Sequence, residues 1–222
     1  MKKEDILEYV LNTGSNSIEV FGGRYNGGYE LQQCPQEITE FLFKYQEKEI
    51  ENFLEIGVAA GGNTRIFCDF LKVHNVFTID LDEHPSIDGE SNPKAREKNF
   101  SQLKNSGTLK SFYGDSHSVE ADQWLRDTQV SFDMAFIDGD HTEIGIYKDT
   151  LLVLPYLKNY AYVIYHDTLI NVYTNQDGEV ISGSYQFDIK LKEGLIPSLK
   201  HEEDFFDTSI YRKGISVYKF IK

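Results

Sequence analysis

The sequence contains few cysteines, a minority of basic residues and no long apolar run, and each shortage argues against a class of protein. Only Cys34 and Cys68 occur, without CxxC spacing, so we expect no disulfide. Lys and Arg number 22 against 36 Asp and Glu, a formal net charge of −14. Nucleic-acid binding depends on clustered basic side chains, so nucleic acid is not expected as a partner. No apolar run approaches the roughly 20 residues of a membrane span, so no membrane association is expected.

The start of the chain and its length indicate a cytoplasmic protein built around one core. Met1-Lys2-Lys3 is followed at once by acidic residues, without an apolar stretch or a cleavage site, so no secretory signal is expected. A chain of 222 residues can bury one sizeable core but is short for two. We therefore predict a main domain over 51–222, preceded by a helical flank over 1–50. A homo-oligomer is left open.

Between residues 52 and 167, short apolar runs alternate with amphipathic stretches, the pattern of repeated β-α units around a parallel sheet. A helix is predicted after Gly61-Gly62, where apolar residues recur at helical spacing, and another from Pro93 to Ser106-Gly107. A further helix should bury Tyr147, Leu151 and Leu154. The predicted strands are Phe53–Ile56, Val76–Ile79, Leu109–Tyr113, Phe132–Ile137 and Ala161–Tyr165.

The two flanks add elements at either end of this core. The N-terminal flank has two predicted helices, around Ile6 and around Phe41, separated by the Gly-rich stretch Phe21–Gly28, which we expect to act as a lid over a substrate. At the C-terminus, Phe205–Tyr211 and Ile215–Ile221 are predicted strands that close the sheet as a hairpin. Residues 173–193 fit helix and strand periods about equally.

The first predicted strand runs into a glycine turn that is typical of a ligand site. Phe53 to Thr64 reads FLEIGVAAGGNT, a strand, a tight turn with Gly57 and Gly61, and a helix N-terminus. A dinucleotide site would have GxGxxG for a pyrophosphate, whereas here Ala59 takes the second glycine position and the strand carries Glu55. A carboxylate suits a cation, and S-adenosylmethionine carries both an ammonium and a sulfonium. The alternative is an ordinary turn between a strand and a helix.

Polar residues also end the second and third predicted strands. Asp80 lies where a carboxylate can accept hydrogen bonds from a ribose diol, which nicotinamide and methionine-derived cofactors share. Ser116 and His117 follow the third strand, where short polar side chains could bond the rim of an adenine; helix capping explains them equally well. Ligands of open α/β sheets bind outside the carboxyl ends of the strands, and these residues all fall there.

The fourth and fifth strands deliver five ionisable groups, in the segments IDGDH and YHD. Asp138 and Asp167 would repel each other, and no Lys or Arg lies near them in sequence, so a divalent cation is predicted between them. The alternative is that both cap loops. His141 has a pKa range suited to removing a proton at neutral pH, or it is a structural histidine.

These motifs resemble the class I S-adenosylmethionine-dependent methyltransferases, and among them the macrocin-type O-methyltransferases and the cephalosporin hydroxylase-like proteins. The resemblance runs from Gln32 to Asp167 and is most specific in IDGDH followed by HD. It implies a Rossmann-like α/β fold with a seven-stranded, mostly parallel sheet, helices on both faces and a C-terminal antiparallel hairpin. Residues 51–222 would then form the methyltransferase domain.

The resemblance also implies roles for the site residues. Glu55, Gly57 and Gly61 would surround the methionine part of the cofactor, Asp80 the ribose, and Ser116 and His117 the adenine. Magnesium, or another divalent cation, would bind Asp138 and the pair His166-Asp167, and His141 would be the base. The sequence departs from the family at two points. Macrocin-type enzymes have Glu in place of His166, so His166 would bind a softer metal, orient Asp167 or take the proton itself. Catechol-type enzymes have Asn in place of Thr168, so that ligand is not carried over.

The sequence therefore predicts transfer of a methyl group from S-adenosylmethionine to a hydroxyl of a small molecule, with a sugar or polyol suggested by the resemblance alone. Two alternatives remain. One is a protein that binds the cofactor without turnover, which the exchange at His166 would permit. The other is an NAD-dependent oxidoreductase, which Asp80 supports and Glu55 opposes.

Overall fold

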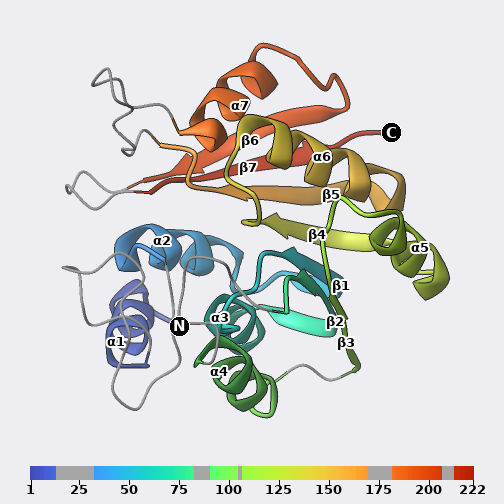
Figure 1. The fold of residues 1–222 in the computed structure, drawn as a ribbon. Helices are drawn as coiled ribbons and strands as arrows, with labels where there is room; N and C mark the ends of the chain where they lie inside the picture. Colours follow the sequence, from blue (N-terminus) through green and yellow to red (C-terminus); the bar gives the residue numbers. More distant parts are fainter. Residues whose placement is uncertain (14–32, 83–90, 105–106, 170–181, 207–212) are drawn as a thin grey trace, which may run out of the picture.

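The computed structural model describes residues 1–13, 33–82, 91–104, 107–169, 182–206 and 213–222. Seven strands form one sheet in the order β3-β2-β1-β4-β5-β7-β6 (Figure 1). The first five strands along the chain are parallel, and β7 is antiparallel to both β5 and β6. Their bounds are β1 Glu49–Ile56, β2 Lys72–Asp80, β3 Leu109–Tyr113, β4 Phe132–Ile137, β5 Leu157–His166, β6 Leu199–Phe205 and β7 Ile215–Phe220.

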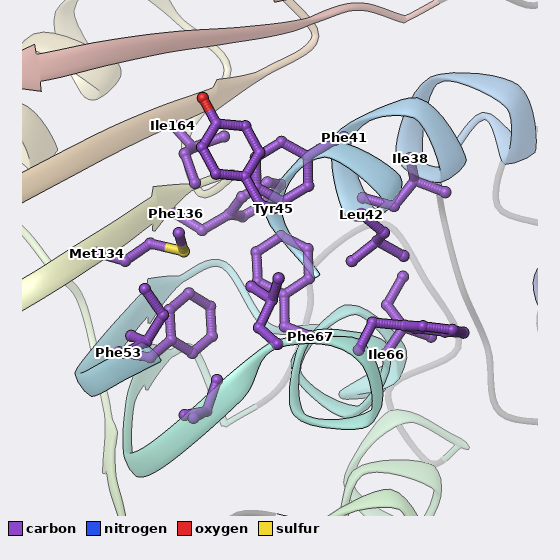
Figure 2. Close-up of a cluster of buried hydrophobic side chains, with 14 of the residues drawn as sticks. Ile38, Phe41, Leu42, Tyr45, Phe53, Ile66, Phe67, Met134, Phe136 and Ile164 are labelled. Atoms are coloured by element: carbon purple, nitrogen blue, oxygen red, sulfur yellow. The ribbon is translucent and has the colours of Figure 1, made fainter. Parts of the chain in front are cut away.

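Helices cover both faces of the sheet because its central strands are apolar on both sides. On β1, Phe53 packs into one buried cluster and its neighbour Leu54 into the other, since successive side chains point to opposite faces. The first cluster includes side chains of α1, α2 and α3, and the second includes side chains of α5, α6 and α7. Figure 2 shows members of the first cluster from α2 and α3. The helices are α1 Lys3–Thr13, α2 Pro35–Tyr45, α3 Gly62–Phe70, α4 Ser91–Phe100, α5 Val119–Thr128, α6 Glu143–Val153 and α7 Gly183–Lys192, with a short 3₁₀ helix at Leu154–Tyr156.

This arrangement confirms the predicted fold class, and the bounds predicted for the third and fourth strands are those observed. The boundary predicted at residue 50 stays a prediction; α1 and α2 share a core cluster with the sheet. The predicted lid, Phe21–Gly28, lies outside the described residues. Among the described residues, no helix combines the length and the apolar character that crossing a membrane requires.

Two predicted elements were wrong in extent, and one was wrong in the face that it buries. The strand that pairs with β7 is Leu199–Phe205, whereas Phe205–Tyr211 was predicted; residues 207–211 lie outside the described part of the chain. Leu199–Phe205 was missed because this edge strand faces solvent and its run of charged residues from 200 to 204 hides the strand pattern. The helix from Pro93 was predicted to reach Ser106, whereas α4 ends at Phe100. On α6, Tyr147 and Leu151 are exposed.

The buried face of α6 carries polar side chains, which explains the error in that helix. It presents Ile146, Asp149, Thr150 and Val153 to the interior. An apolar pattern could not reveal a face that includes a buried aspartate and threonine. The segment 173–193, which fits helix and strand periods equally, is helical over Gly183–Lys192, where α7 lies. Residues 173–181 lie outside the described part of the chain.

Candidate active site

The glycine turn after β1 lies directly against the end of β4. Gly57 has φ +83°, and a Cβ atom built on it would lie 2.0 Å from the backbone oxygen of Asp138. Only glycine tolerates both that φ and that approach. Gly61, with φ +78°, is the N-cap of α3 and packs beside the ring of Phe100. Gly57 thus brings the turn into contact with the acidic segment that follows β4, and Gly61 brings it into contact with α4.

Glu55 lies beneath this turn and is completely buried. The amide of Asn63 donates a hydrogen bond to one carboxyl oxygen at 2.9 Å, and the hydroxyl of Thr64 donates to the other. Burial raises the pKa of Glu55 to about 8, although the two hydrogen bonds oppose the shift. The side chain therefore joins the end of β1 to the first turn of α3. Its predicted contact with a cofactor stays a prediction.

Asp80, at the end of β2, pairs with an arginine that sequence reasoning missed. Oδ2 of Asp80 accepts hydrogen bonds from the backbone N–H of Ala59 at 2.7 Å and from Nη2 of Arg96 at 2.8 Å. Nε of Arg96 also donates to the carbonyl of Ala59 at 2.8 Å. Burial raises the pKa of Asp80, and the charge of Arg96 opposes that shift. The predicted ribose-binding carboxylate is thus fixed to the glycine turn by a buried guanidinium.

Ser116 and His117, which follow β3, both contact Asp149 on α6. The hydroxyl of Ser116 donates to Oδ1 of Asp149 at 2.6 Å, and Nε2 of His117 lies 3.2 Å from the same oxygen. Asp149 is fully buried, and burial raises its pKa to about 6 despite the hydrogen bond from Ser116. Nothing in the sequence marked Asp149, because it lies on a helix and not at the end of a strand.

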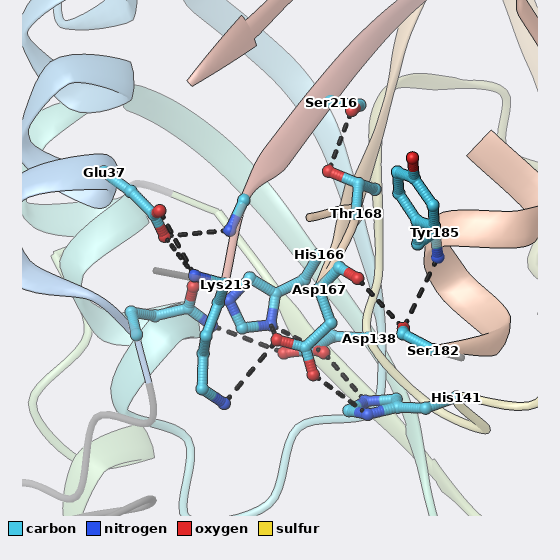
Figure 3. A network of polar contacts seen from close by, with 12 residues as sticks. Glu37, Asp138, His141, His166, Asp167, Thr168, Ser182, Tyr185, Lys213 and Ser216 are labelled. Carbon is cyan, nitrogen blue, oxygen red and sulfur yellow. Dashed lines mark hydrogen bonds and ion pairs between the residues drawn. The ribbon is translucent and has the colours of Figure 1, made fainter. Parts of the chain in front are cut away.

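The acidic cluster at the ends of β4 and β5 contains two histidines between two aspartates (Figure 3). Nε2 of His141 lies 3.1 Å from Oδ1 of Asp138, and its Nδ1 lies 3.0 Å from Oδ2 of Asp167. Nδ1 of His166 lies 2.9 Å from Oδ1 of Asp138 and 3.4 Å from Oδ1 of Asp167. Asp167 has φ +57°, an uncommon conformation for a residue with a side chain, of the kind found at functional sites.

A lysine that is distant in sequence also reaches this cluster. Nζ of Lys213 lies 3.6 Å from Oδ1 of Asp167, on the opposite side of the carboxylate from His141 (Figure 3). The backbone N–H groups of Lys213 and Gly214 donate to the buried carboxylate of Glu37 on α2, at 2.9 to 3.2 Å. A positive group was expected beside the two aspartates, and Lys213, which comes from a different part of the chain, supplies one. The divalent cation stays a prediction.

These contacts determine the charges of the cluster. Burial by itself would raise the pKa of Asp138, but the charge of His166 and hydrogen bonds from both histidines bring it below the ordinary value. The pKa of Asp167 is also lowered, by His166, Lys213 and His141 against the effect of burial. Burial lowers the pKa of His141, but its bonds to the two aspartates outweigh that and raise it well above the ordinary value. In this arrangement His141 is protonated at neutral pH.

Among the described residues, one group has the donor types and the spacing of a metal site. Asp138, His141 and Asp167 each offer one ligand atom, and these atoms lie within 4.8 Å of one another. Two carboxylate oxygens and an imidazole nitrogen fit a divalent cation. His166, which was predicted as a ligand, is outside this group: its Nδ1 faces the carboxylates, and its Nε2 is buried without a hydrogen-bond partner among the described residues.

Comparison with known proteins gives a family match and many similar folds. The family described as methyltransferase domain matches residues 54–168, just over half of the chain. No curated protein matches. An O-methyltransferase from Bacillus cereus, solved with S-adenosylhomocysteine, is 15% identical with a TM-score of 0.60 over 100% of this chain and 93% of that one.

Two further solved structures have the same fold. The N-methyltransferase NodS from Bradyrhizobium japonicum WM9, with S-adenosylhomocysteine, is 14% identical with a TM-score of 0.57, over 84% of this chain and 85% of that one. The O-methyltransferase TomG from Streptomyces achromogenes, involved in tomaymycin synthesis and solved with S-adenosylmethionine, is 14% identical with a TM-score of 0.55, over 78% and 74%. At these identities the likeness concerns the fold.

Proposed function

Because the chain belongs to the methyltransferase domain family, we propose that it uses S-adenosylmethionine to methylate a hydroxyl oxygen of a small molecule. The observation that carries the proposal is the contact between Gly57 and Asp138. It places the turn expected to hold the cofactor directly beside a cluster able to handle a proton. Methyl transfer needs this proximity, because the accepting oxygen, the methyl carbon and the sulfur must lie in line.

The cofactor is proposed to lie across the carboxyl ends of β1, β2 and β4. Gly57 and Gly61 leave room for its methionine part, Asp80 accepts from the ribose, and Ser116 and His117 lie beside the adenine. Glu55 supports the turn through its hydrogen bonds to Asn63 and Thr64. Solved proteins of similar fold with bound S-adenosylmethionine or S-adenosylhomocysteine support this choice of cofactor.

An oxygen acceptor is favoured over a nitrogen acceptor by the chemistry of the cluster. A neutral amine attacks the methyl group without first losing a proton, whereas an alcohol is a weak nucleophile until its proton is removed. Asp138, His141 and Asp167 supply the acid–base groups for that removal. A sugar or polyol is the proposed acceptor class, as the resemblance suggests.

Divalent-metal assistance is part of the proposal, with Asp138 and Asp167 as the ligands of the ion. Such an ion, when bound, would lower the pKa of a hydroxyl placed on it. His141 takes the proton once Asp138 or Asp167 has turned toward a ligand, because the loss of one carboxylate partner lowers the pKa of its imidazole. His166, buried against Asp138, orients that carboxylate.

Calorimetry tests the cofactor first. We expect S-adenosylhomocysteine to bind with micromolar-range affinity and NAD not to bind. Asp80→Asn should weaken S-adenosylhomocysteine by about 1–3 kcal/mol through the loss of ribose hydrogen bonds. Binding of NAD without any signal from S-adenosylhomocysteine would favour the oxidoreductase instead and refute the proposal.

Transfer of a labelled methyl group to a panel of sugars and polyols, with and without a chelator, tests the chemistry. Asp138→Asn and Asp167→Asn should remove most turnover and the dependence on the ion, while cofactor affinity stays nearly unchanged. The matched control is Asp133→Asn, at the opposite end of β4, where the carboxylate pairs with Lys158. His141→Ala should reduce turnover about 10²–10⁴-fold, with a residual rate that rises with pH.

Two results would contradict parts of this proposal. Full activity of both aspartate variants in the presence of a chelator would exclude metal assistance and leave His141 with His166 as a metal-free pair. Cofactor binding without methyl transfer to any acceptor in the panel, with or without added divalent ions, would favour a binding protein that has no turnover.

A further inference from the structure

Asp149 is a buried acid that the proposed reaction does not use, and its contacts go to the residues expected beside the adenine. Its Oδ1 accepts a hydrogen bond from Ser116 at 2.6 Å and lies 3.2 Å from Nε2 of His117. Nε2 of His117 also lies 3.2 Å from the carbonyl of Gly145, one turn earlier on α6. The backbone of Asp140 also interacts with this carboxyl group and lowers its pKa, although Oδ2 has no hydrogen bond of good geometry among the described residues.

This contact joins two segments that follow different strands at the carboxyl ends of the sheet, where the cofactor is proposed to bind. β3 is separated from β4 by β2 and β1. The contact between the loop after β3 and α6, the helix after β4, therefore links segments that follow strands on either side of β2 and β1, whose ends carry Asp80 and Gly57. The loop after β4 also adapts to Asp149, because a Cβ atom built on Gly139 would lie 3.1 Å from its Oδ2.

Stability alone does not account for a carboxyl group in this place. Burying a carboxyl group costs free energy, and an apolar side chain at this position of α6 would avoid that cost. The raised pKa of Asp149 reflects the same penalty. What the carboxylate provides is a fixed acceptor that sets the orientation of two polar side chains in the loop after β3.

We propose that Asp149 is a positioning residue for the cofactor's adenine: its carboxyl group holds Ser116 and His117 in the orientation in which they recognise the base. This inference rests on the proposed use of S-adenosylmethionine. It goes beyond that use because it assigns the choice of base to a residue on α6 that does not contact the cofactor itself.

Calorimetry with two ligands that differ only in the base tests the inference. S-adenosylhomocysteine has a 6-amino group, and S-inosylhomocysteine has an oxygen in its place. The wild-type chain should prefer the adenine ligand. In Asp149→Asn the Kd for S-adenosylhomocysteine should rise about tenfold, the effect of losing one good hydrogen bond, and the preference between the two ligands should largely disappear. Ser116→Ala should show the same loss of preference.

Asp188→Asn is the matched control, because Asp188 is also a buried aspartate on a helix of the same face. It accepts a hydrogen bond from the hydroxyl of Tyr218 at 2.6 Å and pairs with Lys192 at 2.7 Å. We expect this variant to lose thermal stability and to keep both Kd values within twofold of the wild type.

The double variant Asp149→Asn/Ser116→Ala should lose no more of the preference between the two ligands than either single variant, since both substitutions break the same interaction. Equal weakening of the binding of both ligands in Asp149→Asn would show a merely structural role and overturn the inference. An unchanged preference for the adenine ligand in Ser116→Ala would also overturn it, and this variant remains informative if Asp149→Asn does not fold. Failure of the wild-type chain to bind S-adenosylhomocysteine at all would instead refute the proposed function.

Discussion

Replacing Glu55 by Gln should make the stability of the protein less dependent on pH. Burial raises the pKa of Glu55 from an ordinary value of 4.5 to about 8, so the folded chain holds a proton there at neutral pH. The unfolded chain releases that proton above its lower pKa. Because the folded state binds the proton more tightly, the free energy of unfolding falls as the pH rises between these two values.

The size of the effect follows from the two pKa values. Between pH 6 and pH 8 the contribution of Glu55 to the free energy of unfolding should decrease by about 2 kcal/mol. Glutamine has the same shape and no charge, so it removes this decrease. It also keeps both neighbours satisfied, because Asn63 can still donate to its carbonyl oxygen and the hydroxyl of Thr64 can accept from its amide.

Urea denaturation of both proteins at pH 6, 7 and 8 measures the difference. The wild-type free energy of unfolding should fall more steeply with pH than that of Glu55→Gln, and the two curves should separate by about 2 kcal/mol over this range. Glu143→Gln is the control, since Glu143 is an exposed residue paired with Lys190, and it should follow the wild type. Parallel curves for wild type and Glu55→Gln would refute the reasoning.

Two further substitutions test the local geometry. Gly57→Ala should lower the free energy of unfolding by about 2–5 kcal/mol in urea denaturation, because its Cβ would collide with the Asp138 carbonyl. The control is Gly194→Ala, where φ is also positive, at +97°, but an added Cβ would meet no neighbouring atom within 4 Å among the described residues. This variant should lose clearly less stability, and equal losses would exclude the collision as the cause. Ser118→Ala removes the N-cap of α5, whose oxygen accepts from the Ala121 N–H, and should lower the free energy of unfolding by about 1 kcal/mol, with Ser118→Asp restoring most of it.

Much of the fold could be predicted because the strands of the sheet's centre are short apolar runs between glycine or polar turns. The rule that strand ends carry ligand residues placed Gly57, Asp80, Asp138 and Asp167 at one edge of the sheet before their contacts were known. β6 was misplaced because an exposed edge strand has no such apolar run. Local pattern is therefore informative where both faces of a strand are buried.

The partners of the site residues could not be predicted, because they come from elements that no local pattern connects. Arg96 reaches Asp80 from α4, Asp149 reaches Ser116 from α6, and Lys213 reaches Asp167 from the segment before β7. No basic residue lies near Asp138 and Asp167 in sequence, but Lys213 lies beside Asp167 in the folded structure. Charge balance in a site is a property of the tertiary structure.

The buried carboxylate of Glu37 joins two parts of the chain that both lie outside the segment matched by the family. It receives the N–H groups of Lys213 and Gly214, so the beginning of α2 and the segment before β7 meet beside Asp167. Neither of these parts carries the glycine turn or Asp80. If the proposed function holds, a change of acceptor could therefore arise in evolution by altering these two parts together, while the segment proposed to bind the cofactor is inherited unchanged.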